Sequence, residues 1–239
     1  MGLWSHARSP RHPVAGSRRH CSLRARGCIT CGSRHTGGVI QSQLFAVKPE
    51  WPPGFSYSPE FLSPAQEREL LELIRELPFE EAQYKEWRAR RRIVSFGGRY
   101  DYSQNELGEA PPIPPFLYPL RLQLARWAGI AEERMRHATV AEYRPATPLG
   151  WHRDVPEFEE VVGVSLLGHA RMRFRPWPPA AGQRATWKID LEPRSAYQIR
   201  GAARWQWQHA VSPTPALRYS ITFRTRNLHK PRRQPSADE

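Results

Sequence analysis

Cysteine is missing from most of this 239-residue chain, because Cys21, Cys28 and Cys31 are its only cysteines. Disulfides therefore do not hold the remainder of the fold. No run of about 18 apolar residues occurs, so we expect no transmembrane helix. The N-terminus also lacks the compact apolar stretch of a secretory signal. We expect a soluble intracellular protein, located in the cytoplasm and without a membrane partner.

Acidic residues are absent before Glu50, whereas residues 1–43 contain seven arginines. The formal net charge is +13, so the body of the chain stays basic even without this segment. A basic surface suits a polyanion such as nucleic acid, through phosphate contacts and counterion release. The alternative is a cationic surface that only contacts solvent. The excess of Arg over Lys can likewise result from a GC-rich genome and not from selection for phosphate binding.

Residues 1–43 have almost no apolar periodicity and are predicted to be a disordered extension. The spacing of Cys21, Cys28, Cys31 and His35 could hold zinc, although it matches no common zinc finger. Alternatives are a non-native extension, from a start codon assigned too early, and an Arg-rich targeting presequence. We expect the globular domain to span residues 44–228 and to be followed by a flexible tail, 229–239.

Two helices are predicted ahead of the strands. Ser63 is a suitable N-cap, Pro64 fits the first helical position and Gln66 completes a capping box. Apolar residues on one side continue to Leu77, and a proline follows. A second helix is predicted near residues 115–128, before a glycine.

Short segments separated by Gly or Pro predict strands from residue 137 onward. In the last of them, Tyr219, Ile221 and Phe223 form an apolar face, and the residues between them form a polar face. Helices followed by many short strands are typical of an α+β domain with a jelly-roll or barrel-like sandwich. The expected strands are 139–143, 161–167, 171–175, 186–191, 196–200, 205–209 and 218–225.

The segment GWHRD places His152 and Asp154 two residues apart, so on an extended backbone they share one face. They are either metal ligands or a His and an Asp on a polar strand end. A non-haem iron site needs two imidazoles and one carboxylate. His209, at a predicted strand end, suits the third position better than His169, which is typical of a turn, or His137, which has no obvious partner.

Arg218 and Arg224 lie on the polar face of the last predicted strand. An arginine that faces inward is costly unless it is paired. A dicarboxylate cosubstrate is a suitable partner, because guanidinium binds carboxylate through two parallel hydrogen bonds. The alternative is that both arginines lie on an outer, solvated face.

The order of these motifs resembles the AlkB-like family of iron(II)- and 2-oxoglutarate-dependent dioxygenases, and its compact bacterial-type members in particular. The H-x-D pair and a distal His are followed by R-Y-x-[LI]-T-F-R, which here is RYSITFR, residues 218–224. The resemblance covers about residues 44–228. It is also carried by the segments 96–103, 113–117, 143–145, 162–166 and 173–175.

The resemblance implies a double-stranded β-helix (jelly-roll) core with N-terminal helices packed on its major sheet. It implies that Fe(II) is bound by His152, Asp154 and His209. It also implies an enzyme that uses 2-oxoglutarate and O2, releases succinate and hydroxylates a C–H bond. A hydroxylated N-methyl group then leaves as formaldehyde.

The resemblance further implies that Arg218 holds the distal carboxylate of 2-oxoglutarate and that Tyr143 hydrogen-bonds this cosubstrate. Arg224 is implied to support the carboxylate on the metal side. The family often has Asn where this chain has Ala141, so Ser220 or a water would supply the missing hydrogen bond.

For the substrate, the resemblance implies binding by Arg99, Tyr100 and Tyr102, after the basic stretch of residues 87–92. Cations beside aromatic rings suit single-stranded nucleic acid or an extruded base. The alternative is a basic loop before a core strand with inward-packed tyrosines. Base-repairing members often have an acidic residue where this chain has Pro156. Glu157 follows it and is the fourth residue expected to contact the substrate.

Three functions are therefore open. The first is an oxidative demethylase of N-alkylated nucleobases in DNA or RNA, which serves alkylation repair. The second is the same oxygenase core acting on a protein or a small molecule, and the third is a catalytically silent nucleic-acid-binding protein. We expect a monomer whose partner is a single strand or a flipped base.

Overall fold

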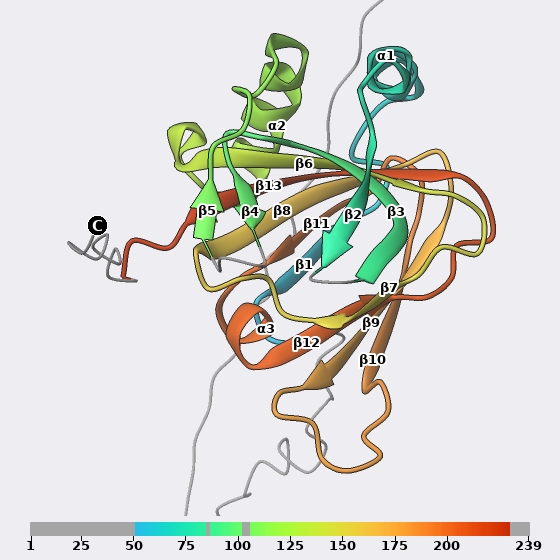
Figure 1. The fold of residues 1–239 in the computed structure, drawn as a ribbon, viewed down its shortest axis with the longest axis vertical. Helices are drawn as coiled ribbons and strands as arrows, with labels where there is room; N and C mark the ends of the chain where they lie inside the picture. The colour runs from blue at the N-terminus through green and yellow to red at the C-terminus, as the bar shows by residue number, and fades with distance from the viewer. Residues whose placement is uncertain (1–50, 85–86, 102–105, 230–239) are drawn as a thin grey trace, which may run out of the picture. The chain divides into compact units, whose positions relative to one another are not determined.

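The structure is a computed structural model that describes residues 51–84, 87–101 and 106–229 (Figure 1). The predicted extension and tail fall almost wholly outside the described residues, as do the three cysteines and the histidine that could hold zinc. Those predictions therefore remain predictions.

Two antiparallel sheets form the framework, and a small two-stranded sheet, β4–β5, stands beside them. The larger sheet has the strand order β1-β11-β8-β13-β6-β3-β2, and the smaller has the order β10-β9-β12-β7. The helices are α1 (Pro64–Arg75), α2 (Tyr118–Ala128) and α3 (Gly201–Trp205), with 3-10 turns η1 (Pro115–Leu117) and η2 (Glu132–Arg134). The strands are β1 (Phe55–Ser58), β2 (Glu80–Tyr84), β3 (Trp87–Phe96), β4 (Arg99–Asp101), β5 (Glu106–Gly108), β6 (Met135–Tyr143), β7 (Leu149–His152), β8 (Phe158–Leu166), β9 (Ala170–Pro176), β10 (Trp187–Leu191), β11 (Ala196–Ile199), β12 (Trp207–Val211) and β13 (Arg218–Arg226).

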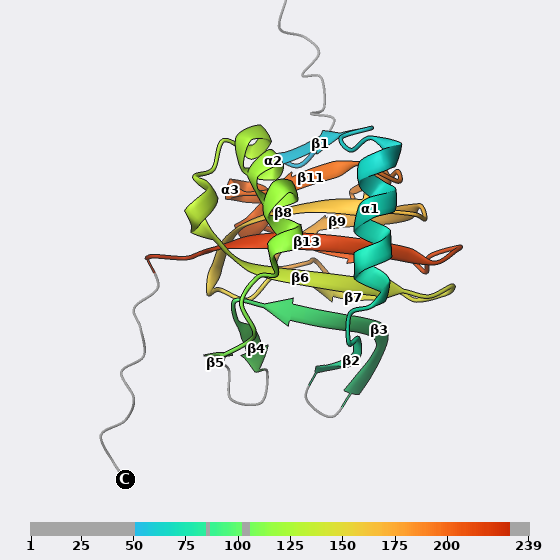
Figure 2. The same ribbon diagram turned by 90° about the horizontal axis from the view of Figure 1, so that it is seen from above.

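Helices α1 and α2 lie across one face of the larger sheet (Figure 2). Helix α1 begins as predicted, because the Ser63 hydroxyl accepts from the Gln66 amide and the Gln66 side chain accepts from the Ser63 amide. Helix α2 ends at Gly129, whose φ of 67° is left-handed and suits glycine. Their buried residues, such as Ile74 and Leu124, join one core cluster with the sheet.

Strand β13 separates this core from the interior between the sheets. Its residues Tyr219, Ile221 and Phe223 pack in the cluster beneath the helices. Arg218 and Arg224, on its other face, line a cavity. As the alternation in the sequence predicted, one face of β13 is apolar and packs in the core, and the other face is polar. The predicted jelly-roll fold is confirmed.

Three local predictions are corrected. The segment predicted as a strand from Trp205 begins in helix α3, and the strand starts two residues later, at Trp207. His209 consequently lies inside β12 rather than at its end. His137 lies within β6, not before it.

In the described part of the chain, no helix has the length and hydropathy needed to cross a membrane.

Candidate active site

A cavity of about 820 Å³ is lined by residues of both main sheets. The larger sheet contributes residues of β6 and β13, and the smaller contributes residues of β7 and β12. This volume lies in the range of small-molecule and cofactor sites. All seven residues that the sequence assigned to metal or cosubstrate line this one cavity; they are Tyr143, His152, Asp154, His209, Arg218, Ser220 and Arg224.

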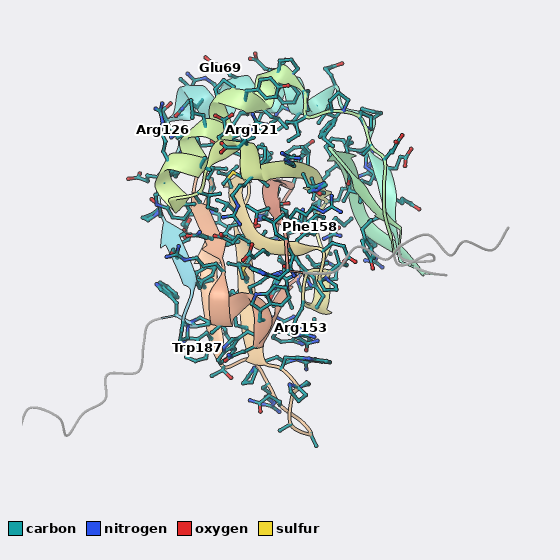
Figure 3. The ribbon with its side chains drawn as sticks, turned by 90° about the vertical axis from the view of Figure 1, so that its left-hand side faces the viewer. Glu69, Arg121, Arg126, Arg153, Phe158 and Trp187 are labelled. Carbon is teal, nitrogen blue, oxygen red and sulfur yellow. The ribbon has the colours of Figure 1, made fainter. Side chains whose placement is uncertain are left out.

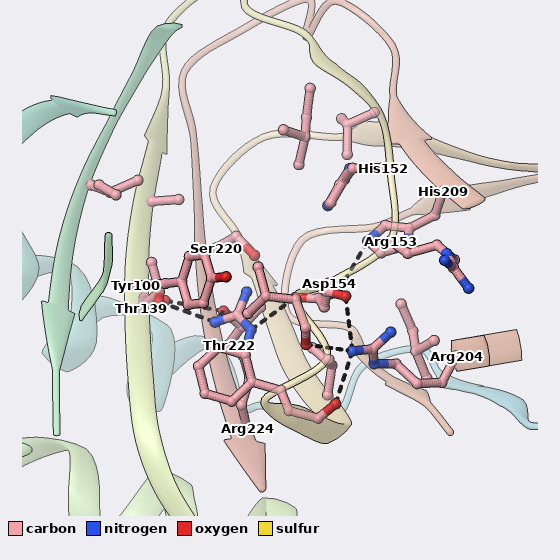
Figure 4. A pocket seen from close by; sticks show the side chains of 18 of the residues that line it. Tyr100, Thr139, His152, Arg153, Asp154, Arg204, His209, Ser220, Thr222 and Arg224 are labelled. Carbon is pink, nitrogen blue, oxygen red and sulfur yellow. Dashed lines mark hydrogen bonds and ion pairs between the residues drawn. The ribbon is translucent and has the colours of Figure 1, made fainter. Parts of the chain in front are cut away.

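His152, Asp154 and His209 form a compact cluster in the cavity (Figure 4). One nitrogen or oxygen atom from each lies within 4.8 Å of the others. The two histidines are direct partners across β7 and β12, and their ring centroids are 4.2 Å apart. His209 Nε2 lies 3.7 Å from Asp154 Oδ2. Sheet pairing thus joins residues that are far apart in the sequence.

Both imidazoles are suited to donate a lone pair. His152 Nδ1 lies 2.9 Å from the carbonyl oxygen of Gly150, so a proton on Nδ1 leaves Nε2 as the electron-pair donor. Burial and the neighbouring His152 lower the pKa of His209 to about 3. Desolvation also lowers the pKa of His152. Neutral imidazole is the form that binds metal ions.

Asp154 is held as a carboxylate by the larger sheet. Burial is the largest single influence and alone would raise its pKa, but Arg224, His209 and Arg204 together outweigh burial and keep the pKa below its usual range. Arg224 Nε donates to Asp154 Oδ1 at 2.9 Å. The segment that follows is fixed by Arg204, whose Nη2 donates to the carbonyl oxygens of Asp154, Val155 and Phe158.

Arg218 is a buried cation, with 1% of its surface exposed. Its Nε donates to Ser165 Oγ at 2.8 Å, and its guanidinium lies 4.9 Å from the centroid of the Tyr143 ring. Its Nη1 has no hydrogen-bond partner among the described residues, and none of their carboxylates pairs with it. A buried, unsatisfied guanidinium nitrogen at a cavity wall is an incomplete anion site.

Tyr143 and Ser220 lie close to this cation. Arg91 Nη1 donates to the Tyr143 hydroxyl at 3.5 Å. Burial alone would raise the pKa of Tyr143, but the charges of Arg91 and Arg218 outweigh it and lower the pKa. The Ser220 side chain hydrogen-bonds to Tyr197. These hydroxyls give the cavity wall both donors and acceptors.

Of the residues implied to bind substrate, the structure describes only some. Tyr100 lies in β4 and lines the cavity. Arg99 also lies in β4, although its side chain is outside the description, and Tyr102 is outside the described residues. Pro156 and Phe158 line the cavity, but Glu157 between them does not.

The basic stretch before these residues is not a loop, contrary to one of the two interpretations of the sequence. It is the first half of strand β3, and Arg91 lines the cavity. The next residue of the strand, Arg92, donates two hydrogen bonds of 2.8 Å to the carboxylate of the buried Glu142. Arg91 is therefore a site residue that the sequence did not reveal, because three consecutive arginines hide the alternation of the strand.

Comparison with known proteins agrees with this geometry. Residues 54–224 match the pattern of the 2OG-Fe(II) oxygenase superfamily. The chain belongs to this superfamily. Its members use Fe(II), 2-oxoglutarate and O2, so the present chain is a dioxygenase with these cofactors. The His–Asp–His donor set fits a non-haem iron, and the unsatisfied Arg218 fits a carboxylate of the cosubstrate.

The chain is also similar to individual proteins, and several of them are AlkB homologues by name. The uncharacterized protein L905 of Acanthamoeba polyphaga mimivirus is 29% identical over 193 residues, 72% of this chain and 84% of that protein. The tRNA (carboxymethyluridine(34)-5-O)-methyltransferase alkbh8 of Xenopus tropicalis is 26% identical over 172 residues, 70% of this chain. Those residues make up only 26% of the frog protein.

The fold itself has a solved counterpart. The structure of OsALKBH1 superposes with a TM-score of 0.56 over 73% of this chain and 98% of that chain, at 18% sequence identity. This likeness confirms the jelly-roll architecture.

Proposed function

We propose that this AlkB-like oxygenase is an oxidative demethylase of N-alkylated nucleobases in DNA or RNA. The observation that carries the proposal is the pairing, in one cavity, of the His152–Asp154–His209 cluster with the unsatisfied guanidinium of Arg218. The three clustered residues would hold Fe(II), and Arg218 would hold the distal carboxylate of 2-oxoglutarate. The catalytic domain in this proposal is residues 44–228.

The iron and its cosubstrate would supply the oxidation, which consumes O2 and 2-oxoglutarate, gives succinate and CO2, and hydroxylates an N-methyl group that leaves as formaldehyde. The neutral imidazoles of His152 and His209 donate electron pairs. Asp154 contributes a negative charge because Arg224 keeps it ionised. Tyr143 and Arg91 bracket the side of the cavity next to Arg218 and would orient the cosubstrate.

Three features support a nucleobase as substrate. The chain has a net charge of +13, which favours a polyanionic partner. The frog relative is named for action on tRNA. Rings of Tyr100, His137 and Phe158 also line the cavity, and flat side chains suit an extruded base.

His137 is a further candidate for contact with the substrate. Its Nδ1 is buried without a hydrogen-bond partner in the described part of the chain. Burial and the charge of Arg224 lower the pKa of His137 to about 4, so this ring is neutral near pH 7. A neutral imidazole can donate or accept one hydrogen bond at the edge of a base.

The test is formaldehyde release from single-stranded DNA and RNA that contain 1-methyladenine or 3-methylcytosine. The reaction contains Fe(II), 2-oxoglutarate and ascorbate, and His152→Ala is assayed beside the unaltered protein. Release that disappears in the variant supports the proposal. Slow 2-oxoglutarate consumption without formaldehyde from any oligonucleotide contradicts a base substrate.

That second outcome would favour the alternative function, in which the same core oxidises a protein or a small molecule. One observation favours this alternative: Pro156, not an acidic residue, lines the cavity just after the Asp154 motif. Proline offers no side-chain acceptor to the amino group of a base.

A further inference from the structure

The outer face of the smaller sheet carries a row of arginines and tryptophans. His209 faces the cavity, so its neighbour Ala210 faces the other way. Trp151 borders the cavity as well, and its ring contacts the arginines of the outer face. Arg173 on β9 is the register partner of Ala210. Because alanine is small, it leaves room for Trp151 to reach across β12 to the arginines of β9.

Three guanidinium groups stack on indole rings here. Arg173 and Arg175 lie 5.0 and 4.6 Å from the centroid of the Trp151 ring. Arg153 lies 4.9 Å from the centroid of the Trp177 ring, which is 41% exposed. We call these five residues the Arg–Trp surface. Contact with an indole face is favourable for each cation, and it leaves N–H groups of the guanidinium available for a ligand.

The positive charge of this surface is not neutralised within the described residues. Arg175 Nε donates to the Gln208 side chain, and Arg153 Nη1 donates to the carbonyl oxygen of Trp205. None of the three arginines forms an ion pair with a described carboxylate. The contrast is Arg171 on the same strand, which makes two hydrogen bonds with Asp190.

The Arg–Trp surface is continuous with the cavity, because Arg153 and Trp177 also line it. Arg153 and Trp187 lie on the opposite side of the molecule from Arg121 and Arg126 of the helical layer (Figure 3). A ligand that leaves the cavity past Arg153 would therefore meet exposed indole and unpaired guanidinium, not the helices.

We propose that the Arg–Trp surface binds a single-stranded polynucleotide beside the nucleotide that occupies the cavity. This inference rests on the proposed function and adds to it a route for the flanking strand. Arginines bind the phosphates, and the exposed indole of Trp177 stacks on a base. An acidic peptide would use the arginines alone and gives no role to the flat, exposed ring.

The test compares the full chain with the double variant Arg173→Gln/Arg175→Gln and with Trp177→Leu. Binding of single-stranded DNA and RNA is measured by fluorescence anisotropy over a range of salt concentrations. We expect affinity to fall at least about 10-fold in the double variant, because charge-assisted hydrogen bonds are lost. The slope of log Kd against log salt should shrink by about 0.7 for each lost phosphate contact.

Arg126→Gln is the control, because it removes one positive charge, against two in the double variant, from an exposed position on α2. It should bind as the unaltered protein does. The double variant Arg173→Lys/Arg175→Lys should keep the salt slope but lose part of the affinity, since lysine retains the charge without the flat stack. Thermal unfolding verifies that every variant is folded. A methylated mononucleotide, which has no flanking strand, should keep its KM in the double variant Arg173→Gln/Arg175→Gln.

Two results would overturn the inference. One is equal binding by Arg173→Gln/Arg175→Gln and Arg126→Gln, and the other is equally tight binding of poly-glutamate of matched charge. Formaldehyde release by the unaltered protein is measured in parallel. If demethylation persists while the variants bind normally, the surface inference fails and the proposed function stands. If the unaltered protein binds no strand and releases no formaldehyde, both fail.

Discussion

The two sheets contribute different chemistry to the same cavity. The smaller sheet supplies two imidazoles, His152 and His209. Their pKa values are lowered, so both rings are neutral near pH 7. The larger sheet supplies the cations Arg218 and Arg224 on one face of β13. One sheet therefore suits a metal, and the other suits anions.

The two chemistries meet at Asp154, which contacts both His209 and Arg224. This carboxylate follows β7 of the smaller sheet and receives its hydrogen bond from the larger one. Neither sheet alone is therefore sufficient to form the metal site. The smaller sheet and the segment after it supply the ligands, and the larger sheet keeps the carboxylate ligand ionised and oriented.

The largest effect is expected from the smaller sheet. His152→Ala and His209→Ala should each abolish turnover, since a lost ligand costs more than the roughly 10–100-fold of a supporting contact. Succinate formation and binding of Co(II), followed by visible absorption, are the measurements. His169→Ala is the control, because that exposed ring pairs with Glu192 outside the cavity. Normal turnover in either site variant would refute the metal assignment.

On the larger sheet, Arg218→Lys should raise the KM for 2-oxoglutarate by about 10–100-fold. A point charge cannot reproduce the two parallel hydrogen bonds of a guanidinium with a carboxylate. Steady-state kinetics at saturating Fe(II) measure the change, and Arg171→Lys on the exposed side of β9 should leave the KM unaltered. An unchanged KM in Arg218→Lys would remove this residue from its proposed role.

Breaking the link between the sheets should have a smaller effect. Arg224→Gln loses the 2.9 Å contact with Asp154 and should weaken metal affinity about 10-fold. Calorimetric titration with Co(II) gives the affinity, and Arg224→Lys should recover part of it. Because Arg224 acts here through Asp154, a change confined to the KM for 2-oxoglutarate would count against this positioning role.

Packing inside the larger sheet gives a fourth prediction. A Cβ at Gly163 would lie 2.8 Å from the Tyr197 ring and 2.9 Å from Thr222 Cγ2, so glycine makes room for the tyrosine. Gly163→Ala should lower the free energy of unfolding by about 1–3 kcal/mol, measured by urea denaturation. The control Gly150→Ala meets nothing within 4 Å and should be close to neutral.

The smallest effect is expected outside both sheets. Deletion of residues 1–43 should leave 2-oxoglutarate turnover unaltered, because the matched superfamily region is 54–224. The measurement is succinate formation by the shortened chain at equal iron. Loss of iron-dependent turnover would show that this segment belongs to the catalytic unit.

Local patterns predicted the parts of the fold that local chemistry determines. The capping box at Ser63 and the alternation along β13 each involve neighbours in the sequence, so both could be recognised. The His152–Asp154 pair was recognised for the same reason. His209 required the resemblance, because its contact with His152 depends on sheet pairing.

Residues whose role depends on distant contacts were not predicted. Arg204 lies in a five-residue helix and acts through backbone carbonyls about fifty residues earlier in the chain. Arg91 was hidden because an arginine-rich strand has the composition of a loop. Its partner strand, β6, supplies the Glu142 that pairs with the adjacent Arg92.

Anaerobic calorimetry of 2-oxoglutarate binding with and without Fe(II) tests most directly whether the two sheets form one site. The unaltered protein, His209→Ala and Arg218→Lys are compared. If the two sheets form one site, tight binding requires both Fe(II) and Arg218, and His209→Ala shows no gain on adding iron. Equal binding with and without Fe(II), or equal binding by Arg218→Lys, would show that the two sheets do not form one joint site for metal and cosubstrate.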